Sequence, residues 1–229
     1  MRTLCLAVAA LCALAGGCAT AQETLRIGVL NDMSGVYADD QGAGSVVAAQ
    51  MAVEDFGGSV AGQKIEVISG DHQNKTDIGA EIARRWLDTE GVGLIVDLPN
   101  SAIALAVADI VRDRNKVMIG SGSGSSVLTG PKCSPNTVHW TYDTWAYGHG
   151  LARAVAQQGV KSVFFITADY AFGHDLEKQF TDEAVRSGVR VKCTVTRLEP
   201  AGSASSICAV FGLHPIAAGR PFTSACQAG

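Results

Sequence analysis

Positive charge is scarce in this sequence of 229 residues. Lys and Arg number 18 against 22 Asp and Glu, which gives a formal net charge of −4, and only 17% of the residues are charged. A mildly acidic chain offers no positive field to a phosphate backbone, so we expect no nucleic-acid partner. Hydrophobic residues make up 47% of the chain, which is enough to bury the core of one large domain or two small ones.

Cysteine is nearly absent from the middle of the chain. Three cysteines lie near the start, one in the middle and three near the end, namely Cys5, Cys12, Cys18, Cys133, Cys193, Cys208 and Cys226. A disulfide framework needs several cysteines within the folded part. We therefore expect none to hold the middle of the chain together.

The first 21 residues have the pattern of an export signal. Arg2 gives a short positive start, residues 4–14 are an uncharged apolar run, and residues 19–21 supply small side chains at a cleavage position. The run is too short to span a membrane comfortably, and no second run of spanning length follows it. We expect residues 1–21 to be a cleaved signal peptide. A lipoprotein anchored through Cys18 is disfavoured, because residues 15–17 lack the large aliphatic side chain usual before such a site.

From residue 22 to residue 192, apolar runs alternate with segments of helical periodicity. The runs predict strands at residues 25–30, 64–69, 93–98, 117–119, 162–166 and 189–191. Between them, residues such as Ile78, Ile82 and Trp86 recur one helical turn apart. This alternation predicts an α/β fold with a doubly wound parallel sheet and helices on both faces.

Residues 193–229 break this pattern. The segment holds three of the seven cysteines and three of the six prolines, but only three charges, Arg197, Glu199 and Arg220. It shows neither alternation nor a helical stripe of useful length. Our hypothesis is that this tail is an out-of-frame or otherwise aberrant ending, which the coding DNA past codon 192 would test.

Ligands of such sheets bind beyond the carboxyl ends of the strands, so five loops are of interest. These loops span residues 31–41, 70–75, 99–101, 120–130 and 168–173. Ser101 begins a helix, where the dipole favours an anion, although the sequence alone favours an ordinary cap made by its hydroxyl. Residues 120–126 are all Gly or Ser, which suits either a ligand-approached backbone or a flexible turn. No Lys or Arg occurs between residues 97 and 111 or between residues 117 and 131, so a site for an anion there suits a carboxylate better than a polyphosphate.

Signatures of nucleotide, metal or covalent chemistry are weak. The loop after the first strand, residues 31–37, matches neither the dinucleotide-binding nor the phosphate-loop pattern. His72 and His174 lack the spacing of a zinc helix, so we expect no metal and no cofactor. Cys133 with His139, His149 or His174 could be drawn as a nucleophile and base, but no catalytic signature surrounds it. We therefore assign no catalytic residue.

Aromatic side chains cluster in two segments. They are Trp140, Tyr142, Trp145, Tyr147, Tyr170 and Phe172. Such residues serve core and interlobe packing, or they form a wall for the apolar body of a ligand.

Several motifs occur in an order that resembles a known family. These are Ile27-Gly28-Val29-Leu30, Met33-Ser34-Gly35, Ala52-Val53-Glu54-Asp55-Phe56, Leu128-Thr129-Gly130 and Asp169-Tyr170-Ala171-Phe172-Gly173. Together they resemble the periplasmic branched-chain-amino-acid binding proteins of ABC importers, over residues 25–192. The resemblance implies the type I periplasmic binding protein fold, with a complete first lobe at 22–141 and the start of a second lobe at 142–192. It also implies a periplasmic monomer that delivers a small carboxylate, such as an amino acid or an aromatic acid, to an ABC permease in the inner membrane.

The family's ligand site can be carried onto this sequence by position. The resemblance implies that Ser101 and Ala102 receive the ligand carboxylate and that Gly122, Ser123 and Gly124, with Ser125 beside them, complete the pocket. Gln41 stands where members often have an aromatic residue over the ligand side chain, and Tyr170 and Phe172 belong to the opposing loop. Two alternatives stay open: an exported hydrolase that uses Cys133 or a loop serine, and a sensory ligand-binding domain.

Overall fold

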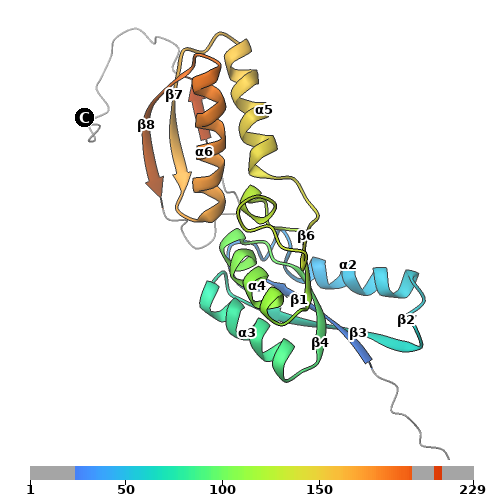
Figure 1. Cartoon of the computed structure of the whole chain (residues 1–229). Coiled ribbons are helices and arrows are strands. Elements are labelled where there is room, and N and C mark those ends of the chain that lie inside the picture. Colours follow the sequence, from blue (N-terminus) through green and yellow to red (C-terminus); the bar gives the residue numbers. More distant parts are fainter. Residues whose placement is uncertain (1–23, 198–208, 213–229) are drawn as a thin grey trace, which may run out of the picture.

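The first half of the chain builds a six-stranded sheet in the computed structural model, which describes residues 24–197 and 209–212 (Figure 1). The strands are β1 Thr24–Asn31, β2 Ser59–Val60, β3 Gln63–Asp71, β4 Val92–Asp97, β5 Val117–Gly120 and β6 Thr137–His139. Their order across the sheet is β2-β3-β1-β4-β5-β6. All neighbours pair in parallel except β2 and β3, which form an antiparallel hairpin. The carboxyl ends of β1, β4 and β5 therefore lie at one edge.

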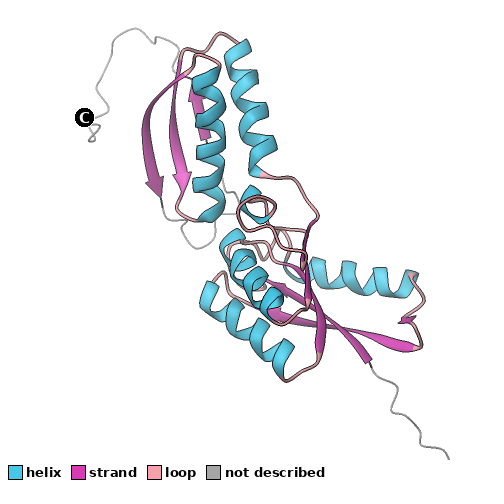
Figure 2. Cartoon of the chain, in the orientation of Figure 1, coloured by secondary structure: helices cyan, strands magenta, loops and turns pink. Residues whose placement is uncertain are grey.

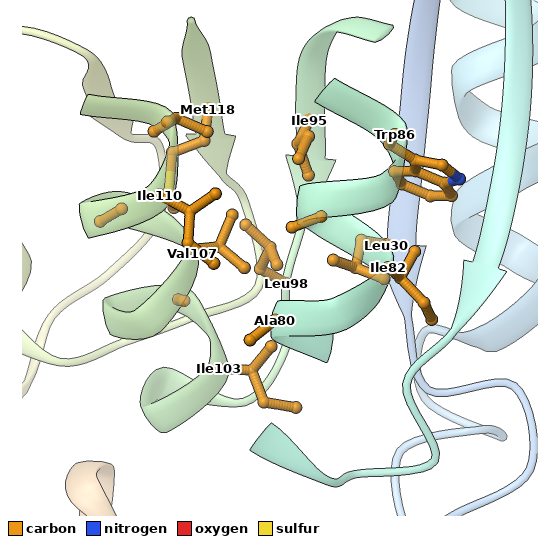
Figure 3. Close-up of a cluster of buried hydrophobic side chains, with 14 of the residues drawn as sticks. Leu30, Ala80, Ile82, Trp86, Ile95, Leu98, Ile103, Val107, Ile110 and Met118 are labelled. Carbon is orange, nitrogen blue, oxygen red and sulfur yellow. The ribbon is translucent and has the colours of Figure 1, made fainter. Parts of the chain in front are cut away.

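Helices cover both faces of this sheet (Figure 2). They are α2 Gly42–Asp55 on one face, and α3 Thr76–Asp88 and α4 Ser101–Asp113 on the other, with a short 3-10 helix at Ser126–Leu128. The main core lies under α3 and α4. As Figure 3 shows, Ile82 and Trp86 of α3 and Ile103 and Val107 of α4 face Leu30 and other apolar side chains of the strands. The helical spacing seen in the sequence is thus the spacing of this buried face.

Trp86 explains why two strands carry glycine beneath α3. A Cβ at Gly28 would lie 2.4 Å from the Trp86 ring, and a Cβ at Gly70 would lie 2.8 Å from it. The indole therefore rests directly on the backbone of β1 and β3.

The α2 face is covered less completely. Ala49 and Val53 of α2 line a groove of about 450 Å³ together with Ile27, Val29 and Val96 of the strands. Phe56, which directly follows α2, is 65% exposed. The apolar stripe of α2 therefore packs only partly on the sheet.

A second, smaller sheet follows. Its order is β8-β7-β9, with β7 Ser162–Ala168 central, β8 Arg190–Arg197 parallel to it and β9 Ala209–Gly212 antiparallel. The helices α5 Thr144–Gln157 and α6 Ala171–Arg186 pack beside it, and Phe165 meets Phe180 edge to face at 5.3 Å between ring centroids. We call residues 24–139 the first lobe and residues 144–197 with 209–212 the second lobe.

The predicted α/β fold is confirmed, and the six expected strands are all present. The short strands β2, β6 and β9 were missed, and β2 and β9 add antiparallel edges to a sheet architecture expected to be parallel. Strand β8 also runs beyond residue 192, so residues 193–197 and 209–212 have regular structure where the sequence pattern offered none.

The expected signal peptide and the rest of the tail lie outside the described residues. No helix in the described part of the chain has the length and apolarity to cross a membrane.

Candidate functional site

A strained turn at the end of β4 brings two loops of the predicted site together. Asp97 and Leu98 have φ angles of 83° and 64°, a region that residues other than glycine rarely occupy. The carbonyl of Asp97 accepts hydrogen bonds from the N–H groups of Ser121 at 3.1 Å and Gly122 at 3.2 Å. The turn thus fixes residues 120–126, which we call the Gly/Ser loop, beside the start of α4.

The Asp97 side chain is buried in the same turn. Asn31 Nδ2 donates to Asp97 Oδ2 at 2.8 Å, and Ser121 Oγ donates to Oδ1 at 3.3 Å. Burial raises the pKa of Asp97, and its hydrogen bonds, including one with Ser45, only partly offset that effect. The carboxyl group therefore joins β1, β4 and the Gly/Ser loop.

The cap of α4 is Asn100, one residue before the position expected. Its side-chain oxygen accepts from Ala102 N at 2.8 Å and Ile103 N at 3.3 Å. The expectation that the Ser101 hydroxyl caps this helix is wrong, because Ser101 is already its first helical residue and its Oγ instead accepts from Ser125 N at 3.2 Å. The Ala102 N–H that the resemblance assigned to a ligand carboxylate already has a partner.

Two glycines of the Gly/Ser loop lie close to side chains from other segments. A Cβ at Gly122 would lie 2.4 Å from Gln41 Oε1, and one at Gly124 would lie 2.8 Å from the Phe172 ring. Ser123 and Ser125 are instead fully buried. The two glycines therefore let Gln41 and Phe172 lie against the loop backbone.

Two backbone donors of this loop have no hydrogen-bond partner among the described residues. The N–H groups of Ser123 and Gly124 make no hydrogen bond to any described residue, whereas those of their neighbours Gly122 and Ser125 do. The Ser123 Oγ also has no partner in the described part of the chain. Adjacent unpartnered N–H groups can hold one carboxylate without a cationic side chain.

The second lobe contributes aromatic residues that lie close to the Gly/Ser loop. Tyr170 and Phe172, at the end of β7 and the start of α6, stack with their ring centroids 6.1 Å apart. Tyr37, in the loop after β1, donates its hydroxyl to the Tyr170 hydroxyl at 2.8 Å. The structure thus brings predicted residues of both lobes together. Tyr37 was missed, because nothing in its local sequence indicates a contact 133 positions away.

The aromatic cluster after β6 is a surface feature. Trp140 is 75% exposed, and Tyr142, Trp145 and Tyr147 are about half exposed. Tyr142 also reaches the Gly124 backbone, where a Cβ would lie 2.9 Å from its ring. Of this cluster, Tyr142 is therefore the member whose ring lies against Gly124.

The residues drawn as a nucleophile and base make no catalytic pair. Cys133 is exposed, and it forms no hydrogen bond to a histidine in the described part of the chain. The rings of the three histidines bind other groups: His139 the Ser123 carbonyl, His149 the Trp145 carbonyl and His174 the Asp169 carboxylate. Among the described residues no cluster of His, Cys, Asp and Glu could hold a metal ion.

Two α/β lobes that meet through strand-end loops lined with neutral donors define a hinged ligand-binding class of protein. Residues 24–209 match the family model described as periplasmic binding protein. The chain belongs to this family, whose members are substrate-binding proteins and not a class of enzyme. The recognition made from its sequence motifs is confirmed.

Individual relatives agree with this assignment. Leu/Ile/Val-binding protein homolog 6 of Brucella abortus (strain 2308) is 26% identical over 181 residues, which cover 79% of this chain and 45% of the relative. A periplasmic binding protein of known structure from Burkholderia mallei is 46% identical, with a TM-score of 0.75, over 77% of this chain and 47% of that one. An ABC-transporter solute-binding protein from Rhodopseudomonas palustris BisB5, in complex with 3,4-dihydroxybenzoic acid, is 25% identical, with a TM-score of 0.68, over 76% and 47%. The chain thus spans about half the length of these relatives.

Proposed function

We propose that the protein is a solute-binding receptor of an ABC importer that binds a small carboxylate between its lobes. The observation that carries this proposal is the pair of unpartnered N–H groups of Ser123 and Gly124, in a loop that also contacts Phe172 of the second lobe. A site of neutral donors beside aromatic rings suits a carboxylate with an apolar body.

The aromatic rings of the site and the names of two relatives support the proposed ligand class. One relative is named for binding leucine, isoleucine and valine, and another was solved with a dihydroxybenzoic acid. The rings of Tyr170, Phe172 and Tyr142 favour an aromatic acid in this chain, while the polar Gln41 lies against Gly122 of the same loop. We propose the N–H groups of Ser123 and Gly124, with Ser101 and Gly122 beside them, as the carboxylate end of the site, and Gln41, Tyr170 and Phe172 around the body.

The remaining parts of the function follow from the family. We propose that the protein acts in the periplasm as a monomer, passes its ligand to an inner-membrane permease and catalyses no reaction.

Isothermal titration tests the proposal. The chain is titrated with benzoate, 3,4-dihydroxybenzoate and leucine, and each mixture is then analysed for products by mass spectrometry. We expect saturable one-to-one binding of at least one probe and recovery of the probe unchanged. Hydrolysis of methyl benzoate or leucine amide by the chain, abolished in Cys133→Ala, would support the hydrolase alternative, and no binding to any of the three carboxylate probes contradicts the receptor.

A further inference from the structure

One carboxylate of the second lobe accepts several hydrogen bonds at the junction of the lobes. Asp175 on α6 is 8% exposed. Its Oδ2 accepts from Ser125 Oγ at 2.8 Å, from Ser126 N and Ser126 Oγ at 2.9 Å each, and from Thr144 Oγ1. Its Oδ1 accepts from Gln179 Nε2 at 3.1 Å. Burial raises the pKa of Asp175, but the hydrogen bonds outweigh it and lower the pKa overall, so the group is a carboxylate at neutral pH.

These donors come from both lobes. Ser125 and Ser126 end the Gly/Ser loop of the first lobe, whereas Thr144 begins α5 of the second lobe. Thr144 N also donates to the Gly124 carbonyl at 2.8 Å. On the other side, the Ser125 N–H is held by Ser101 Oγ at 3.2 Å. The loop is therefore fixed between the first residue of α4 and two helices of the second lobe.

The hydroxyl of Ser125 has no hydrogen left for a ligand. A serine carries one O–H donor, and here it points to Asp175. Its lone pairs face the Val127 N–H at 3.3 Å, and a ligand carboxylate has no proton to offer them. Ser125, which the family resemblance placed in the ligand site, is thus hydrogen-bonded to the Asp175 carboxylate instead.

We propose that Asp175 is a positioning residue, which holds residues 123–126 so that the N–H groups of Ser123 and Gly124 face the ligand carboxylate. Ser125 then donates its hydroxyl hydrogen to Asp175 and does not contact the ligand. This inference rests on the proposed function for its ligand, but the geometry of the loop is independent of it. A buried carboxylate suits the task, because charge-assisted hydrogen bonds fix several donors at once.

Hydrogen–deuterium exchange of the full chain tests the positioning role without a ligand. In Asp175→Asn the side chain keeps its size but loses its charge and one acceptor oxygen. We expect exchange across residues 121–126 to quicken about tenfold or more, while residues 103–113 of α4 keep their rate. The matched control is Asp182→Asn on the same helix, whose carboxylate pairs with Lys178 on the surface and should leave the loop unchanged. Unchanged exchange at 121–126 in Asp175→Asn overturns the proposal. Should that variant fail to fold, Ser125→Ala removes one donor and is judged by the same criterion.

Titration with benzoate tests the role of Ser125. If Ser125 acts only through Asp175, the double variant Asp175→Asn/Ser125→Ala binds benzoate no more than about twofold more weakly than Asp175→Asn alone. If the loss of benzoate affinity in the double variant equals the product of the losses in the two single variants, Ser125 contacts the ligand directly and that part of the inference is overturned. Absence of benzoate binding in the natural chain counts against the proposed ligand class, and the exchange experiment still decides the role of Asp175.

Discussion

Tyr37 and Tyr170 join the two lobes through a hydrogen bond between their hydroxyl groups, 2.8 Å long. Tyr37 lies in the loop after β1 and Tyr170 in the loop after β7, so the bond connects the strand ends of both sheets. Tyr170 also stacks on Phe172, which lies against the backbone of Gly124. The contact between the lobes therefore runs through the same loops as the proposed ligand site.

Removing either hydroxyl should weaken the contact between the lobes. We expect Tyr37→Phe and Tyr170→Phe to be non-additive in the free energy of unfolding, with a coupling of about 1 kcal/mol, because each removes one end of the same hydrogen bond. Urea unfolding of the two single variants and the double variant measures this coupling. Tyr147→Phe, which alters a half-exposed tyrosine of α5, is the control. Additive losses would mean that the hydrogen bond between the two hydroxyls contributes nothing to stability.

Gly122 should tolerate no side chain. A Cβ there would lie 2.4 Å from Gln41 Oε1, which can move, but also 2.9 Å from the Cα of Pro99, which cannot move without the turn after β4. We expect Gly122→Ala to lower the free energy of unfolding by about 1–3 kcal/mol. We also expect it to weaken benzoate binding about tenfold or more, because the loop that holds the carboxylate shifts.

Gly150→Ala is the matched control for this change. Gly150 lies within α5, and a Cβ there meets nothing within 4 Å. Because alanine is the better helix former, this variant should gain up to about 1 kcal/mol and bind as before. Equal behaviour of the two variants in unfolding and titration would contradict the steric argument.

The sequence predicted those features that depend on local pattern. Alternating apolar runs and helical spacing gave the α/β fold, and the strand-end rule selected the loops that meet in the structure. Contacts between distant segments left no such signal: Tyr37 is 133 positions from Tyr170, and Ser125 is 50 from Asp175. The cap of α4 was misplaced by one residue because Asn100 and Ser101 are both good caps and only the backbone decides between them.

Gly28 should be needed for the packing of Trp86. A Cβ at Gly28 would lie 2.4 Å from an indole that is itself 2% exposed and has no free space to enter. We expect Gly28→Ala to cost about 1–3 kcal/mol in the free energy of unfolding, measured in urea. Gly44→Ala in α2, where a Cβ meets nothing within 4 Å, should instead stabilise by up to about 1 kcal/mol. A neutral Gly28→Ala would mean that the ring shifts freely.

His72 should make stability depend on mildly acidic pH. The ring is fully buried, its Nδ1 accepts from Asn74 N at 3.0 Å, and its Nε2 has no partner among the described residues. Burial lowers the pKa of His72 to about 4, although Asp32 and Asp71 oppose that shift. In the unfolded chain the pKa returns to about 6.5, so the unfolded state binds the proton more readily. Stability is therefore complete above pH 6.5 and falls, by roughly 3 kcal/mol in all, as the pH drops towards 4.

Protonation of His72 should also reach the start of α4. A proton on Nδ1 removes the acceptor of the Asn74 N–H, and Asn74 Oδ1 in turn accepts from the side chain of the cap residue Asn100 at 2.7 Å. Urea unfolding at pH 7 and pH 4.5 measures the loss. His72→Asn, which keeps an acceptor near the Nδ1 position, should be less stable at pH 7 but lose less on acidification. His174→Asn, which changes an exposed histidine beside Asp169, should keep the natural pH dependence. Because carboxylates such as Asp71 contribute their own loss at low pH, the difference between the natural chain and His72→Asn is the decisive quantity. An equal loss in both chains would show that His72 does not control acid sensitivity.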